Sequence, residues 1–356
     1  MSLEKFTPDE LTPRRFVPTP FGPPVAVLST PISYKENVLR AYAGKIPMWA
    51  PFASGDITRV MAFADPERVA RSKGDGTPRT DGWGVDWIFV DVAGGAMVKP
   101  GAPLVTDINR WEEQVKSIPD PDTWDWEAAY EKVKGSIDDE HATMVTNPGC
   151  LFERLIALMD FENAAVALID DEQKEGVHRL FRTVTDIHKK MYYYIHKYFH
   201  TEIANFNDDW GSQRAEFFST ETAREMLFPY IKEMCDYVHS LGMYWDLHCC
   251  GFVEALVPLF VEAGYDSWCG QPMNDKYKLK KLYGDRMLFT GHINCPPGTP
   301  VEEQDAIIKE FFDTIGEDNR VFVEPNRDCP EGFRERIYEA SRRNYDRLVA
   351  EGRVTD

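Results

Sequence analysis

The chain has 356 residues, of which 43% are hydrophobic and 28% are charged, a composition typical of a soluble globular protein with a large core. Its formal net charge of −19, from 59 acidic against 40 basic residues, argues against binding to nucleic acid. No segment approaches the roughly 18 uninterrupted apolar residues of a membrane-spanning helix, and the charged N-terminus lacks the apolar core of a secretory signal. These features predict a cytoplasmic protein that does not enter a membrane.

The first third of the chain contains few regular elements. Residues 1–34 are rich in proline and charge, which predicts an N-terminal arm lying outside the main body. A helix is expected over 37–44, because Gly44 is a stop signal. The first clear strand signal is 83–90, with Trp83 and Trp87 on one face. Residues 54–80 are expected to form a loop with a short helix, and 91–128 a long loop of the kind that forms lids or pocket walls.

From residue 129 onward, strand and helix signals alternate. Strands are expected over 142–146, 203–207, 243–247, 265–268, 287–290 and 321–323. Helices are expected over 151–161, 171–198, 221–241, 253–263, 276–283 and 301–315, with a last helix ending near 349. This repeat predicts an α/β fold, a single (β/α)8 TIM barrel over 35–356 with an N-terminal extension. A doubly wound sheet is less favoured, because no strand is followed by G-x-G-x-x-G or by a P-loop.

A candidate metal site follows the strand over 243–247, at His248-Cys249-Cys250-Gly251. Because side chains alternate along a strand, His248 and Cys250 are expected to point the same way and Cys249 the other way. An imidazole and a thiolate on one face form two legs of a tetrahedral zinc site. The alternative is structural, since buried cysteine is ordinary core material. The odd count of 7 cysteines favours free thiols or metal ligands over disulfides.

A catalytic zinc site needs a third protein ligand, which should come from another strand end. Glu324 directly follows the strand over 321–323, and the softer ligand Cys329 comes shortly after it. Position favours Glu324 and ligand chemistry favours Cys329, so both stay open. His292 and Cys295 are more remote alternatives. Each residue also has a structural interpretation, as a cap, an ion-pair partner or a buried thiol.

Other polar and aromatic residues gather past the predicted strands. Asp208 and Asp209 precede Trp210-Gly211, and one carboxyl group of such a pair can act as a general acid or base. Asp209 is the candidate for this catalytic role beside His248, although helix capping is an equally frequent use of such a pair. The residues expected to line a flat substrate pocket are Trp83, Trp87, Asp208, Trp210, Gln271 and Asn274.

Taken together, these motifs resemble the uroporphyrinogen decarboxylase superfamily over residues 35–350. The matching features are Trp83-Gly84-Val85-Asp86-Trp87, Asp208-Asp209-Trp210-Gly211, His248-x-Cys250-Gly251, Gln271, Gly291 and Gly298-Thr299-Pro300. The resemblance implies a (β/α)8 barrel. Decarboxylases of this family carry Arg-Gln-Ala-Gly-Arg-Tyr near the N-terminus, whereas this chain has Arg40-Ala41-Tyr42-Ala43-Gly44-Lys45. The chain is therefore more similar to the zinc methyltransferase branch, which uses a His-x-Cys pair and a later third ligand.

That branch moves a methyl group from a small substrate to the cobalamin of a separate corrinoid protein. Its third ligand is usually a Cys in a Gly-Cys pair, but here Glu324 stands at that place and Cys329 follows. A carboxylate donates less charge than a thiolate and makes the metal a stronger Lewis acid, which favours an ether substrate. We therefore expect the methyltransferase of an O-demethylase acting on phenyl methyl ethers. The alternatives are a metal-free decarboxylase-like lyase with Asp209 as the acid, a barrel without enzymatic activity, and a methyltransferase whose substrate is methanol, a methylamine or a thiol.

Overall fold

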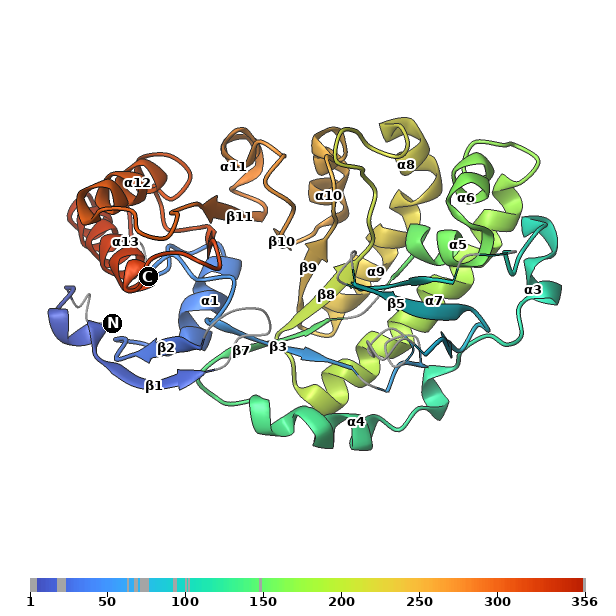
Figure 1. Ribbon diagram of the computed structural model, residues 1–356, viewed down its shortest axis with the longest axis horizontal. Helices are drawn as coiled ribbons and strands as arrows, with labels where there is room; N and C mark the ends of the chain where they lie inside the picture. The colour runs from blue at the N-terminus through green and yellow to red at the C-terminus, as the bar shows by residue number, and fades with distance from the viewer. Residues whose placement is uncertain are drawn as a thin grey trace. The chain divides into compact units, whose positions relative to one another are not determined.

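The computed structural model describes residues 5–17, 24–62, 64–66, 70, 77–91, 95–99, 101, 103–146 and 149–354. They form two compact units (Figure 1). The first unit draws its residues from 1–58, 137–143 and 266–356, and the second from 59–136 and 144–265. In both units parallel strands alternate with helices, and none of the helices described is long and apolar enough to cross a membrane.

The second unit is built around the parallel strands β8 (Ile203–Asn207) and β9 (Tyr244–His248), together with the last three residues of β7 (Ala142–Thr146). β8 pairs with β7 on one side and with β9 on the other, and Asn207 lies opposite His248 at the carboxyl end. The helices that accompany these strands are α5 (Phe152–Met159), α6 (Phe161–Ala167), α7 (Lys174–Phe199), α8 (Thr220–Met226), α9 (Phe228–Ser240) and α10 (Val257–Ala263). Figure 1 shows α7 running beside α9.

The core of the second unit covers its central strand on both faces. The first four residues of β8 are all buried, as expected for a parallel strand that is covered on both faces. Trp245 of β9 stacks on Tyr265 with ring centroids 4.4 Å apart, and Phe206 of β8 meets Trp245 edge-on at 5.0 Å. These ring contacts hold β8 and β9 in register, so that their carboxyl ends lie side by side.

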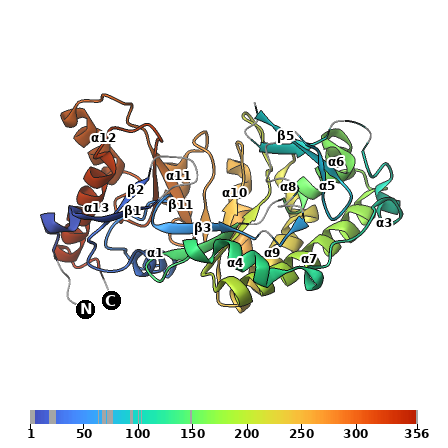
Figure 2. The same cartoon turned by 60° about the horizontal axis from the view of Figure 1, so that its bottom comes forward.

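The first unit contains the parallel strands β10 (Ser267–Trp268), β11 (Leu288–Ile293) and β12 (Phe322–Pro325), again in chain order. Its helices are α1 (Tyr34–Tyr42), α11 (Lys276–Tyr283), α12 (Val301–Asp313) and α13 (Phe333–Ala350). Phe52 forms a parallel bridge to Val323 of β12. An antiparallel hairpin of β1 (Pro13–Val17) and β2 (Val25–Leu28) completes the unit (Figure 2).

The region around Trp83 differs from the sequence expectation. Trp83 precedes the strand, which is β5 (Asp86–Val90), and β5 pairs antiparallel with β4 (Arg79–Thr80) and β6 (Gly95–Val98). The loops expected over 54–80 and 91–128 are wrong in part: they contain β3 (Ile57–Met61), β4, β6, the start of α4 (Trp126–Val133) and a short α3 (Trp111–Gln114). Tertiary pairing supplies hydrogen bonds to these short segments, whose local periodicity is too weak to reveal them.

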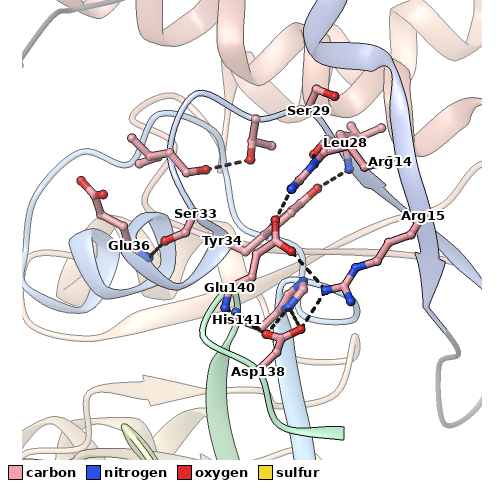
Figure 3. Close-up of polar contacts among 12 residues, drawn as sticks. Arg14, Arg15, Leu28, Ser29, Ser33, Tyr34, Glu36, Asp138, Glu140 and His141 are labelled. Carbon is pink, nitrogen blue, oxygen red and sulfur yellow. Dashed lines mark hydrogen bonds and ion pairs between the residues drawn. The ribbon is translucent and has the colours of Figure 1, made fainter.

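Ion pairs attach the β1–β2 hairpin to the segment before β7 (Figure 3). Arg15 of β1 bridges Asp138 at 2.8 Å and Glu140 at 3.1 Å, and Arg14 also binds Glu140. His141 Nδ1 lies 2.9 Å from Asp138 Oδ1. Asp138, Glu140 and His141 are close enough to hold a metal ion, but the two arginines already neutralise both carboxylates. We therefore assign this cluster a structural role.

Asp56, a buried carboxyl group of the first unit, is expected to make stability depend on pH. Its Oδ2 accepts hydrogen bonds from Trp49 Nε1 at 2.8 Å and from the Phe52 amide at 3.1 Å, while burial raises its pKa from 3.8 to about 6. Because the folded state binds this proton more tightly, its stabilising contribution is complete below about pH 4 and is lost as the pH rises through 6, a change of about 3 kcal/mol.

The test compares thermal unfolding of the wild type and of Asp56→Asn between about pH 4 and 7. Asparagine keeps an oxygen for both hydrogen bonds and cannot ionise. The variant should therefore lose less stability than the wild type as the pH rises. Parallel profiles for the two proteins would contradict the assignment.

Candidate metal centre

The candidate centre is carried by two loops of the second unit that follow β8 and β9. The first contains Asp208-Asp209-Trp210-Gly211 and the second Cys249-Cys250-Gly251. The β8–β9 ladder continues past the strands, because the Asp208 amide donates to the His248 carbonyl at 3.1 Å. The carboxyl ends of neighbouring parallel strands thus bring the two loops into contact, where barrel enzymes place their active sites.

Three half-buried side chains, two from these loops and one from the last residue of β9, form a potential metal site. Asp209, His248 and Cys250 each offer a ligand atom, and these atoms all lie within 4.8 Å of one another. Cys250 Sγ is 3.3 Å from His248 Nε2, and the Cys250 amide donates to Asp209 Oδ1 at 2.7 Å. The site therefore combines a nitrogen, a sulfur and an oxygen donor, which are the ligand types of zinc in proteins.

The two adjacent cysteines have different environments, in agreement with the strand-alternation argument. Cys250 is half-buried, whereas Cys249 is 1% exposed and its Sγ contacts the Cys250 carbonyl at 3.7 Å. Burial raises the pKa of both thiols, and His248 partly offsets this effect for Cys250. In the absence of a metal both cysteines are therefore held as neutral thiols at pH 7.

Two glycines explain how the loops approach so closely. Gly251 has φ +88°, and a Cβ there would lie 2.2 Å from the carbonyl carbon and oxygen of Gly211. A Cβ on Gly211 would in turn lie 2.6 Å from the Phe252 carbonyl oxygen. Neither contact tolerates a side chain, so both glycines are required by the packing of the loops that carry the ligands.

Asp208 and Asp209 have separate environments, and that of Asp208 differs from the substrate-binding role that the sequence predicts for it. Asp208 has no exposed surface, and its carboxylate accepts hydrogen bonds from the amides of Phe152 and Glu153 and from Trp210 Nε1. Burial raises its pKa to about 7. These contacts correspond to the capping interpretation, and they occupy the carboxylate that the sequence assigns to substrate binding.

The tryptophans predicted to line a substrate pocket are packed into the protein. Trp83, Trp87 and Trp210 are at most 5% exposed. Trp87 Nε1 donates to Asp81, which also pairs with the buried Arg154 at 2.8 Å. The cavity beside Trp83 has a free volume of about 20 Å³, room for about one water molecule. This cavity therefore has no room for an aromatic substrate.

The remaining candidates lie in the first unit. Glu324 belongs to β12 and accepts a hydrogen bond from Ser54 Oγ at 3.2 Å; Arg334 donates to the Ser54 carbonyl at 2.5 Å. Cys329 is half-buried, and burial raises the pKa of its thiol. Because these residues belong to a different unit from His248 and Cys250, a role for either one as the third ligand stays a prediction.

Gln271 and Asn274 form the turn that follows β10. The Asn274 side chain is buried and bonded within this turn. Asn274 is 2% exposed, and its Nδ2 donates to the Gln271 carbonyl at 3.1 Å. Gln271 is half-buried. His292 Nε2, a more remote candidate, lies 3.3 Å from the Gly270 carbonyl oxygen. The structure thus brings together Asp209, His248 and Cys250 and gives Asn274 a turn-forming contact.

Comparisons with known proteins identify the family. The family described as Uroporphyrinogen decarboxylase (URO-D) matches residues 96–322. The chain belongs to the uroporphyrinogen decarboxylase family. This membership and the parallel βα order confirm the predicted (β/α)8 barrel class. No curated protein sequence matches the chain.

The solved structures to which the chain is similar include a methyltransferase. The protein titled "methyltransferase from Methanosarcina mazei" has 14% sequence identity and a TM-score of 0.55, and the match covers 89% of this chain and 99% of that one. Xylanase 10B from Thermotoga maritima has 10% identity and a TM-score of 0.36, with coverage of 65% and 83%.

The sequence did not predict that Asp209 lies with His248 and Cys250 in this member of the uroporphyrinogen decarboxylase family. The sequence assigns Asp209 to acid or base chemistry and seeks the third ligand after the last strand. The grouping could have been predicted from the order of the strands. Because the consecutive strands β8 and β9 are parallel neighbours, Asp209 and His248 lie at adjacent strand ends.

Proposed function

We propose that the protein is a zinc-dependent methyltransferase that moves a methyl group from a small methoxylated substrate to cob(I)alamin on a separate corrinoid protein. The observation that carries this proposal is the group formed by Asp209, His248 and Cys250. Family membership and the methyltransferase fold similarity support the broader assignment to a methyltransferase-type enzyme. We place it in the cytoplasm on its sequence alone.

The residues of the centre fit a zinc ion by chemistry and spacing. His248, Cys250 and Asp209 would hold the ion, since their ligand atoms lie within 4.8 Å of one another and are of the nitrogen, sulfur and oxygen types that bind zinc. Glu324 or Cys329 stays the proposed additional ligand from the first unit. When bound, zinc supplies Lewis acidity that polarises a coordinated oxygen.

The substrate class follows from the donor set. A site with one thiol and at least one carboxylate donates less charge than a site with two thiolates, and it therefore favours an ether oxygen over a thiol substrate. In the proposed reaction the O–CH3 bond breaks, a Co–CH3 bond forms on the partner, and the aryl oxygen keeps the electron pair of the broken bond. Phenyl methyl ethers suit this chemistry because a phenolate leaves more readily than an alkoxide.

The first test is the metal content of the purified protein before and after zinc loading. We expect about one zinc per chain in the wild type and its loss in His248→Ala. The zinc-loaded protein should then transfer methyl groups from methoxyarenes to a corrinoid protein. Failure of every methoxyarene to support transfer to any corrinoid protein would refute the substrate assignment.

A metal-free lyase is the alternative, because the family is named for a decarboxylase. In that case Asp209 acts as the acid and neither His248 nor Cys250 binds a metal. The chain has Ala41 and Tyr42 after Arg40 where the decarboxylase resemblance calls for Arg-Gln-Ala-Gly-Arg-Tyr, which argues against a porphyrinogen substrate. Absence of zinc under both conditions would favour this alternative.

A further inference from the structure

The loop after β8 is bonded to the start of helix α5 through a single carboxyl group, that of Asp208. We propose that Asp208 is the positioning residue of the metal centre: it holds Asp209, His248 and Cys250 in place and contacts neither metal nor substrate. The inference rests on the proposed zinc site and adds a residue to it that a ligand search does not find.

Asp208 is fully engaged with the protein. Its Oδ2 accepts hydrogen bonds from the Phe152 amide at 3.0 Å and from Trp210 Nε1 at 2.7 Å, and its Oδ1 accepts one from the Glu153 amide at 2.9 Å. Phe152 and Glu153 are the first two residues of α5, whose amides have no partner within the helix. The carboxylate therefore fixes the loop after β8 against the start of a helix.

The backbone of Asp208 transmits this position to the ligands. Its amide donates to the carbonyl of His248 at 3.1 Å, and the next residue, Asp209, accepts a hydrogen bond from the Cys250 amide at 2.7 Å. Asp209 is thus adjacent to Asp208 in sequence, and His248 is bonded to the Asp208 backbone. Cys250 is bonded to the Asp209 side chain.

The packing leaves the loops little room to adjust if this anchor is lost. The backbones at Gly211 and Gly251 approach so closely that a Cβ on Gly251 would lie 2.2 Å from Gly211. Trp210, 1% exposed, packs between Phe218 and Phe260 with ring centroids 5.7 and 5.4 Å away. A small rotation of the first loop must therefore displace the second loop as well, and with it Cys250.

Asp208→Asn isolates this role because it preserves the volume of the side chain. The asparagine oxygen can accept from Phe152 and Trp210, but its amide group then faces the Glu153 N–H, donor against donor. Buried outer partners of metal ligands typically change metal affinity by about 10- to 100-fold. We expect Asp208→Asn to weaken zinc binding by a factor in that range.

The experiment measures zinc affinity by competition with a chromogenic chelator, using the full-length wild type and Asp208→Asn. The matched control is Asp56→Asn, because Asp56 is also a buried carboxyl group bonded to an indole N–H and a backbone amide. The control should retain the wild-type zinc affinity. Cobalt(II) absorption spectra provide a second readout, and Asp208→Asn should shift the ligand-field bands whereas Asp56→Asn should not.

The possible outcomes separate this inference from the proposed function. Equal zinc affinities and identical cobalt spectra for Asp208→Asn and the wild type would overturn the positioning role and leave the metal site standing. A wild type that binds no zinc would overturn the proposed function, and the inference with it. If Asp208→Asn does not fold, Trp210→Phe removes one donor from the same carboxylate and keeps a packed ring; unchanged affinity in that variant would overturn the inference.

Discussion

Replacing Cys250 with serine is expected to lower zinc affinity by about 100-fold or more, because even the outer partners of metal ligands are worth about 10- to 100-fold. The hydroxyl of serine is a much weaker zinc ligand than a thiolate. Methyl transfer should fall with the bound zinc. The measurement is zinc content by elemental analysis, together with single-turnover methyl transfer from a methoxyarene to a corrinoid protein.

Cys249→Ser is the matched control for this experiment. Cys249 is the adjacent thiol and is 1% exposed, with its Sγ against the Cys250 carbonyl. Serine at this position should lower stability, because a buried hydroxyl replaces an apolar thiol, while the zinc content stays at its wild-type level. Activity that survives Cys250→Ser would support the metal-free lyase instead. Loss of zinc in both variants would show only that the loop tolerates no change.

The second large effect concerns the buried ion pair between Glu10 and Arg342 in the first unit. Arg342 of α13 is 0% exposed and Glu10 is 6% exposed; Arg342 Nε and Nη2 donate to the Glu10 carboxylate at 2.8 and 3.0 Å. Tyr338 Oη donates to the same carboxylate at 2.6 Å. Arg342→Met removes the cation and leaves a buried carboxylate without its ion-pair partner, which costs about 3–5 kcal/mol.

Arg343→Met provides the control from the next position of the same helix. Arg343 pairs with Glu339, but the two side chains are 63% and 35% exposed, and such surface pairs contribute about 0–1 kcal/mol. Chemical unfolding of both variants should therefore show a large loss for Arg342→Met and little change for Arg343→Met. Similar losses of unfolding free energy in the two variants would mean that helix α13 is sensitive to any substitution and that the ion pair does not stabilise the protein in particular.

The sequence predicted most elements of the second half of the chain because their signals are local, but it did not predict α6 (Phe161–Ala167), and the single helix expected over 221–241 is two helices, α8 and α9. The apolar runs of β8 and β9 and the apolar stripe of α7 mark their own positions, and the helix predicted over 276–283 has the bounds of α11 (Lys276–Tyr283). The weaker signals of β3, β4 and β6 depend on pairing partners, so they were not recognised. A strand that is stable only in a sheet leaves little trace in its own sequence.

What the sequence determined about this protein is its barrel class, its family resemblance and the pair His248 and Cys250, since each follows from local periodicity or from residues close together in the chain. The tertiary structure decided which aspartate joins that pair. Asp209 faces Cys250, whereas its neighbour Asp208 is drawn to Phe152, which is 56 residues away in the chain. It also placed Glu10 against Arg342, 332 residues away. Contacts across such separations depend on how packed elements meet, and no local pattern records them.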